Sequence, residues 1–181
     1  MSETAATPPA ATPVTRAVLE IDAFAATLGW DQPARLFALV DTGQLVSSEP
    51  QLAAQLGLTP GESGELTPVE QEELPQDRPL DEFLGTIAWP ETVAGCALVV
   101  ERQMLPPGAE AELPPGAGEQ ELAQWVAGHP DAQDVRMTVA VLRDGTRETA
   151  LRLREKDSPR EVLTGPDLVP GLAQALLATF A

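Results

Sequence analysis

The sequence predicts an α+β fold: a two-layer domain with a mainly antiparallel sheet of four to five strands, on which N- and C-terminal helices pack. Three observations support this prediction. Residues 134–154 alternate apolar and polar side chains with the period of two that is typical of a half-buried strand. Apolar residues recur at helical spacing near both ends of the chain, over 12–28 and 167–181. Between them lie the apolar runs 35–40 and 94–103, which are too short for helices.

The alternation within residues 134–154 also selects the register of a β-hairpin, because a shift of one residue turns every side chain to the other face. A two-residue turn at Asp144-Gly145 would place Met137 opposite Arg152 and mix the two faces. A three-residue loop that starts at Arg143 instead pairs Met137 with Leu151 and puts Gly145 in the left-handed position of a G1 bulge. We therefore predict the three-residue loop, with one apolar face as the floor of the core: Val135, Met137, Val139 and Val141.

The same register places Arg136 opposite Arg152 on the second face of the hairpin, with Arg154 opposite Asp134 at its end. Like charges directly opposite each other destabilise a sheet, so another group must compensate the arginine pair. Asp134 and Glu148 are the nearest candidates, and a bound carboxylate or phosphate, or an acidic segment of this or another chain, is the alternative. The three arginines are therefore candidate binding residues, and a helix over this face would rule out an exposed arginine site.

Trp30, Trp89 and Trp125 each flank a turn or a short helix. An indole at such a position either seals the edge of a core or anchors a partner. Trp30 and Trp89 join the three arginines as candidate binding residues. Exposure of all three indoles on one surface would indicate an interface.

Capping and turn residues indicate where the other elements begin and end. Thr12-Pro13 begins the first helix and Gly29 ends it. Ser48-Glu49-Pro50-Gln51 has the form of a capping box and opens a short helix that ends at Gly57. Further helices are expected at 80–88, at 119–127 and from Asp167 to the C-terminus.

Residues 66–74 are compatible with two structures. Thr67-Pro68-Val69-Glu70 is able to cap a helix, but the apolar positions that follow are too sparse for a helical face. An edge strand tolerates the proline. We favour the edge strand.

The packed domain is expected to span residues 12–181, preceded by a disordered tail at 1–11. Within the domain, residues 105–118 contain Leu-Pro-Pro-Gly-Ala twice, around Glu110 and Glu112. This composition favours extended, polyproline-like geometry. We interpret the segment as a Pro/Gly-rich acidic connector, and an acidic recognition loop is the alternative.

The charge balance narrows the class of partner. The chain carries 28 acidic and 11 basic residues, a formal net charge of −17, which repels nucleic acid and anionic membrane surfaces. No apolar run approaches the roughly 20 residues of a membrane-spanning helix, and the N-terminus lacks the features of a signal peptide. We therefore expect a cytoplasmic protein without nucleic-acid binding or membrane insertion.

The sequence contains few groups that are able to do chemistry. His129 is the only histidine and Cys96, within an apolar strand, is the only cysteine, so neither a metal cluster nor a nucleophile with its base is apparent. The acidic run 70–73 lacks the pattern of a calcium-binding loop, and the glycines form no phosphate-binding motif. We expect a non-enzyme with no cofactor and no metal.

Several short motifs together resemble a known family. They are Gly29-Trp30-Asp31-Gln32-Pro33 through Val40, Trp89-Pro90 with 93–102, Val135-Arg136 with 142–145, and 165–172. The chain resembles an uncharacterised actinobacterial family that is known by a Propionibacterium locus name, over nearly its whole length after the tail. The resemblance implies no activity, cofactor or site residue. The order of elements also looks like that of type III secretion chaperones, and fold alone does not fix function.

These observations favour a non-catalytic binding or adaptor module, chaperone-like, that docks a protein partner. The alternative is a sensor or carrier of a small anion that uses the arginine-bearing sheet face. The C-terminal helix offers a broad apolar stripe that is either core or a homodimer contact. Its residues are Leu168, Leu172, Ala173, Leu176, Leu177 and Phe180.

Overall fold

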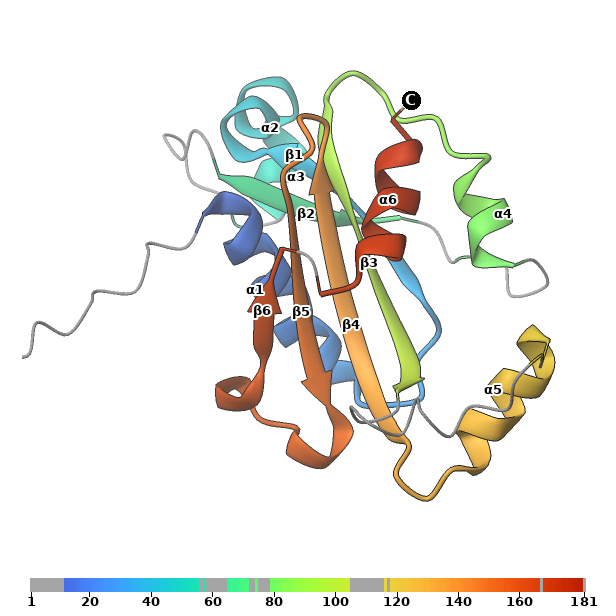
Figure 1. Ribbon diagram of the computed structural model, residues 1–181. Helices are drawn as coiled ribbons and strands as arrows, with labels where there is room; N and C mark the ends of the chain where they lie inside the picture. The colour runs from blue at the N-terminus through green and yellow to red at the C-terminus, as the bar shows by residue number, and fades with distance from the viewer. Residues whose placement is uncertain are drawn as a thin grey trace, which may run out of the picture.

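The centre of the fold is a six-stranded antiparallel sheet with the strand order β2-β1-β3-β4-β5-β6 (Figure 1). The computed structural model describes residues 12–55, 57, 65–71, 74, 79–104, 116, 118–166 and 168–180. The predicted tail at 1–11, nearly all of the predicted connector at 105–118, and the predicted helix cap Asp167 lie outside these residues.

Helices and strands follow one another in the order α, β, α, α, β, α, β, α, β, β, β, α, with two short 3₁₀ turns before the last strand, at Arg154–Lys156 and Pro159–Glu161. Their bounds are α1 Pro13–Leu28, β1 Arg35–Asp41, α2 Thr42–Ser48, α3 Pro50–Gln55, β2 Leu66–Glu70, α4 Leu80–Leu84, β3 Val93–Met104, α5 Glu119–Gly128, β4 Gln133–Leu142, β5 Arg147–Leu153, β6 Leu163–Gly165 and α6 Pro170–Ala178.

The first helix begins and ends where the sequence predicts. The Thr12 side chain accepts a hydrogen bond from the Thr15 backbone N–H at 3.3 Å, which satisfies one of the free donors of the first turn. Gly29 follows the last turn with φ of +82°, a left-handed conformation that glycine adopts without steric cost.

The β4–β5 hairpin has the predicted register and the predicted loop. Met137 pairs with Leu151 and Arg136 pairs with Arg152. The Leu142 N–H donates to the Thr146 carbonyl at 2.8 Å, which closes the loop of residues 143–145. Gly145 has φ of +93°, as a G1 bulge requires.

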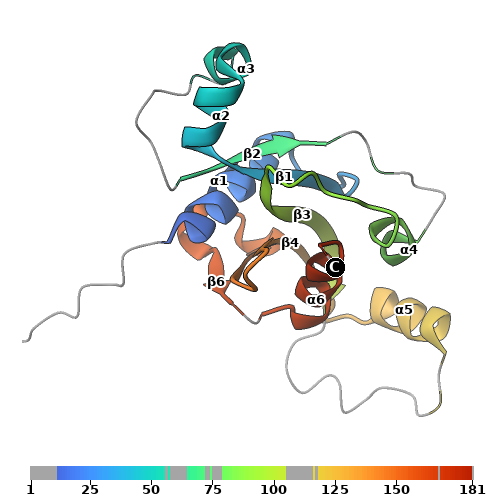
Figure 2. The same ribbon diagram turned by 90° about the horizontal axis from the view of Figure 1, so that it is seen from above.

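Helices cover both faces of the sheet, so the domain has three layers and not the predicted two (Figure 2). The α4 and α6 helices pack on the face formed by the even-numbered residues of β3 and the odd-numbered residues of β4. This core includes Leu84, Cys96, Leu98, Val100, Val135, Met137, Val139, Val141, Ala173 and Leu176. The α1 helix packs on the opposite face, with Val14, Val18, Ile21, Phe37, Leu39, Ala97, Val99, Ala140 and Ala150.

The sheet has six strands, where four to five were predicted. The sixth is β6, which pairs with β5 through Leu163 and its next two residues. So short a strand shows no alternation of apolar and polar side chains from which it could be predicted. Leu163 is also exposed, so its apolar side chain does not mark a buried face. β2 is the edge strand that we favoured for residues 66–74.

Of the remaining helices, α5 lies where it was predicted, α3, α4 and α6 are shorter than predicted, and α2 was not predicted. The segment predicted as one helix at 48–57 contains only α3, and α2 precedes it with the Asp41 carboxylate accepting from the Gln44 N–H at 2.9 Å. α4 is one short turn followed by irregular chain. α6 begins at Pro170, and its apolar stripe packs on the sheet through Ala173 and Leu176.

Candidate functional site

Two of the three arginines of the predicted site are not open to solvent. Arg136 and Arg152 lie opposite each other as predicted, but α1 covers this face, and the two residues are only 1% and 3% exposed. An exposed arginine face, as the anion-binding alternative requires, is therefore ruled out.

Compensation for the arginine pair comes from α1. Arg152 donates from Nε to Asp22 Oδ1 at 3.2 Å and from Nη2 to Asp22 Oδ2 at 2.6 Å, a bidentate pair that is buried on both sides. Its Nη1 donates to Asp157 at 2.9 Å. These hydrogen bonds, the one to Asp22 first, raise the pKa of Arg152 although burial opposes them. Neither predicted compensator forms a hydrogen bond or ion pair with Arg152. Asp134 instead pairs with Arg154, and Glu148 accepts from the Thr15 hydroxyl.

Arg136 is held by Trp30 rather than by an acid. Its guanidinium lies 4.3 Å from the centre of the indole ring, and Nη2 donates to the Gly29 carbonyl. Burial lowers its pKa, and the charge of Glu101 opposes this shift. Nη1 has no hydrogen-bond partner among the described residues. The cavity that Arg136 lines measures about 10 Å³, which is room for about one water molecule and too little for a phosphate or a carboxylate.

Arg154 completes the network at the surface. It donates to both carboxylate oxygens of Asp31 at 3.0 and 3.1 Å and to Asp134 at 3.3 Å. The hydrogen bond from Arg154 lowers the pKa of Asp31. The Arg154 guanidinium also lies 5.6 Å from the Trp30 ring centre. The structure thus brings Trp30, Arg136, Arg152 and Arg154 together, but in an internally neutralised network that fastens α1 and the following loop to the sheet.

Acid should weaken this network. The hydrogen bonds from Trp30 and then from Arg152 hold the pKa of Asp157 below its usual value. A carboxylate with a lowered pKa in the folded protein contributes stability above its unfolded pKa of about 3.9, and this is lost as the pH falls through the folded value. We therefore expect Asp157→Asn to cost stability at neutral pH and progressively less below about pH 4. Urea unfolding of both proteins across this range measures the difference, and a pH-independent difference would contradict the expectation.

Trp89 lies apart from this network, on the α6 side of the sheet. Its Nε1 donates to the Thr179 hydroxyl at 2.8 Å, and its ring stacks on Phe180 with centroids 6.0 Å apart. Trp125 contacts His129 next to α5. The three tryptophans therefore do not share one surface. Trp89 holds the C-terminal helix, which is the core-sealing role that was its alternative.

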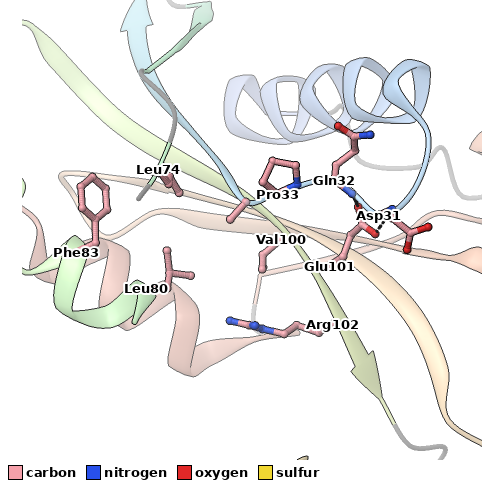
Figure 3. Close-up of a pocket in the computed structure, with 10 residues that line it drawn as sticks. Asp31, Gln32, Pro33, Leu74, Leu80, Phe83, Val100, Glu101 and Arg102 are labelled. Atoms are coloured by element: carbon pink, nitrogen blue, oxygen red, sulfur yellow. Dashed lines mark hydrogen bonds between the residues drawn. The ribbon is translucent and has the colours of Figure 1, made fainter. Parts of the chain in front are cut away.

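A hollow that the sequence analysis did not identify lies beside the end of β3 (Figure 3). β1 pairs with β3 only as far as Arg35 opposite Val99, whereas β3 continues to Met104. Continuing the register would put Pro33 opposite Glu101, but proline has no N–H for the ladder. Asp31, with φ of +63°, then turns the chain away. The resulting hollow measures about 540 Å³ and is lined by Asp31, Gln32, Pro33, Ala34, Leu74, Leu80, Phe83, Val100, Glu101 and Arg102.

A second hollow of about 630 Å³ adjoins the first, and the two share Leu80 and Arg102. It lies between α4, α6 and the sheet, and is lined by Pro79, Leu80, Leu84, Arg102, Met137, Val169, Gly171, Leu172 and Ala175. We call the two hollows together the β3 groove. Volumes of this order suit a small ligand or several side chains of a partner.

Strand alternation decides which way the charged residues of the β3 groove point. Glu101 and Arg102 are neighbours on β3 and point to opposite faces (Figure 3). The Glu101 carboxylate accepts the backbone N–H groups of Asp31 and Gln32, both at 2.8 Å, and so holds the loop. Arg102 is exposed and makes no hydrogen bond or ion pair with another described residue. It is the one cationic side chain among the described residues that line the groove.

Few described residues have the properties of a catalyst. Burial raises the pKa of the Cys96 thiol to about 12, so the thiolate that a nucleophile needs is absent at neutral pH. No group of three or more His, Cys, Asp or Glu side chains within the described part of the chain is placed to hold a metal ion. Among the same residues, no helix is long and apolar enough to cross a membrane.

Fold and site together define an α+β protein with an antiparallel sheet between flanking helices and a groove in which Arg102 has no partner among the described residues. The chain belongs to the family of PPA1309-like proteins, whose model matches residues 14–181. This confirms the resemblance to a family named after a Propionibacterium locus. No curated protein and no solved structure matches the chain, so the likeness to type III secretion chaperones stays a prediction.

Proposed function

We propose that this protein is a non-catalytic binding module, an adaptor or chaperone-like protein, that docks a segment of a protein partner in the β3 groove. The segment presents apolar side chains and one carboxylate. The observation that carries the proposal is Arg102, an exposed cation without a partner among the described residues, at the junction of a hollow of mixed lining and a mainly apolar one.

The lining of the groove supports an apolar segment. Leu80, Phe83 and Leu172 are only partly buried. Leu80 and Phe83 from α4 line the first hollow with Arg102, and Leu172 from α6 lines the second with Leu80 and Arg102. Burying such side chains against a partner contributes roughly 25 cal/mol per Å² of apolar surface. Partly buried apolar side chains that converge on one concave site are typical of a binding surface.

The charge of Arg102 supports a carboxylate. Elsewhere the acidic residues greatly outnumber the basic ones, so a negatively charged partner is repelled except where a cation is free. A guanidinium forms two parallel hydrogen bonds with a carboxylate, which fixes both the position and the direction of the segment. The small-anion alternative has no such free cation at Arg136 and Arg152, because both are buried beneath α1.

A charge reversal tests the proposal. We expect Arg102→Glu to weaken partner binding at least tenfold, because a charged hydrogen bond contributes about 1.5–3 kcal/mol. Tagged protein that carries a photo-crosslinking residue at Phe83 first identifies the partner in cells of the natural host. The affinity of that partner is then measured for the natural protein, for Arg102→Glu and for Lys156→Glu, an equal charge change on an exposed residue outside the groove.

Two results would contradict the proposal. The first is a partner that binds Arg102→Glu and the natural protein equally well. The second is a native mass spectrum in which a small molecule, and not a protein, is bound and is lost from Arg102→Glu. That result would assign the groove to a small amphipathic acid.

A further inference from the structure

A second surface with unused apolar side chains lies on the opposite face of the sheet. The exposed large hydrophobic residues include Leu19, Phe24 and Leu28, all on α1, at 38%, 41% and 36% exposure. The inner stripe of α1, which contains Val18 and Ile21, is already fully buried against the sheet. Leu19, Phe24 and Leu28 lie outside this stripe.

Next to this helix face is a hollow of about 450 Å³ between α1, α3, β1 and β2. Its lining is mainly apolar: Ile21, Phe24, Phe37, Leu52, Pro68 and Val69, with Glu20 and Glu70. Phe24 stands edge-to-face on Phe37, with ring centroids 6.3 Å apart. We call the hollow, together with Phe24 and with Leu28 one turn further along α1, the α1 patch. A continuous apolar surface of this kind marks an interaction site more often than scattered exposed residues do.

The adjoining sheet edge is closed to an added strand. The Thr42 N–H donates to the Glu65 carbonyl and the Gln71 N–H donates to the Leu36 carbonyl. The backbone N–H and C=O groups of the odd-numbered residues of β2 therefore point toward β1, and those of the even-numbered residues point outward. The nitrogen of Pro68 then points outward, where it offers no N–H. The patch is thus suited to side chains of a partner helix and not to a β-strand.

The charged residues of the α1 patch indicate which charge a partner should carry. Glu70 is already paired with Arg35 at 2.5 Å. Glu20 makes no hydrogen bond or ion pair within the described part of the chain, and partial burial raises the pKa of its carboxyl. Glu20 is exposed in the free protein. A lysine or arginine of a docked partner would pair with it, and the apolar side chains of that partner would exclude water and strengthen the interaction.

We propose that the α1 patch docks a basic amphipathic helix of a partner protein. Apolar side chains of that helix enter the hollow beside Phe24, and one of its cations pairs with Glu20. This surface lies on the other side of the sheet from the β3 groove, so the proposal stands independently of the function proposed above.

The probe is a model peptide helix of 14 residues, about four turns, in which pairs of leucine alternate with pairs of lysine. Backbone amide resonances are followed during its titration at physiological salt, about 0.15 M. We expect the shifts to centre on Phe24, Phe37 and Val69. Phe24→Ser should weaken binding at least tenfold and Glu20→Gln severalfold. Leu163→Ser, which changes an exposed leucine of β6, should leave binding unchanged.

Two controls separate this surface from general attraction to an acidic protein. Polylysine of the same length carries charge without leucine, and a leucine–glutamate helix carries leucine without positive charge. Both should bind at least tenfold more weakly than the probe. Leu28→Ser is a second patch variant on the helix surface, and thermal unfolding verifies that each variant is folded.

Three results would overturn the proposal. Shifts spread over the acidic surface, with equal affinity for the natural protein and Phe24→Ser, would reduce the interaction to non-specific attraction. Equal binding of polylysine and the probe would do the same. A concentration-dependent dimer that Phe24→Ser dissolves would assign the α1 patch to a second copy of this chain.

Discussion

Replacing Asp22 by alanine is expected to destabilise the protein by about 3–5 kcal/mol, the usual cost of removing one partner of a buried ion pair. Asp22 and Arg152 are both about 3% exposed, and Asp22 accepts two of the hydrogen bonds of the guanidinium. Without Asp22, Arg152 keeps one acidic partner among the described residues, Asp157, which is partly exposed. Beside it lies Arg136, whose like charge is then no longer offset by Asp22.

Urea unfolding measures this effect, with Asp134→Ala as the matched control. Asp134 also accepts from an arginine, but that pair is exposed and should contribute about 0–1 kcal/mol. The double variant Asp22→Leu with Arg152→Met should be less destabilised than Asp22→Ala, because it leaves no unpaired buried charge. A cost for Asp22→Ala no greater than for Asp134→Ala would show that water reaches Arg152 in solution.

Asp22 also illustrates which part of the fold could be predicted from the local sequence pattern. The period of two in β4 and β5 set the hairpin register, including the opposition of Arg136 and Arg152, because a slip would expose the apolar face. The register does not indicate which element packs on the face that carries Arg136 and Arg152. The signal was Asp22, a carboxylate that follows Ile21 within the buried stripe of α1. A buried acid needs a buried base, and this pairing predicts that α1 packs on the arginine face.

The predicted number of layers was wrong for the same reason: the sequence pattern did not show which face of the sheet α1 covers. Both terminal helices were expected on the sheet, and both are there, but a helical stripe does not say which face it covers. The two faces of β3 are both apolar, with Cys96 and Leu98 on one and Ala97 and Val99 on the other. A strand that is apolar on both faces needs cover on both sides, which favours three layers.

The β3 groove depends on contacts between segments far apart in sequence. Its walls come from the loop before β1, from α4 and from α6, and no local pattern places these together. One signal was present. Cys96, Leu98 and Val100 continue an apolar face, and Arg102 is the next residue on that face. A cation that ends an apolar stripe marks the point at which the stripe meets solvent or a partner.

Gly95→Ala is expected to cost about 3 kcal/mol, at the upper end of overpacking effects. A Cβ atom at this position would lie 2.3 Å from the Val141 carbonyl oxygen and 2.7 Å from a Leu142 methyl group. The first of these is a backbone atom of the neighbouring strand, which is unable to rotate away. Gly95 pairs with both Leu39 and Leu142, so relief of the clash would displace β3 from a strand on one side or the other.

Gly171→Ala is the matched control for Gly95→Ala. It lies in the first turn of α6, where an added Cβ meets no atom within 4 Å, and alanine there should stabilise the helix by about 0.5–1 kcal/mol. The two substitutions add the same methyl group and should shift the urea midpoint in opposite directions. A neutral Gly95→Ala would contradict this expectation. It would mean that β3 and β4 are able to move apart at Gly95, and that β3, which carries Arg102, is held less rigidly than the close approach indicates.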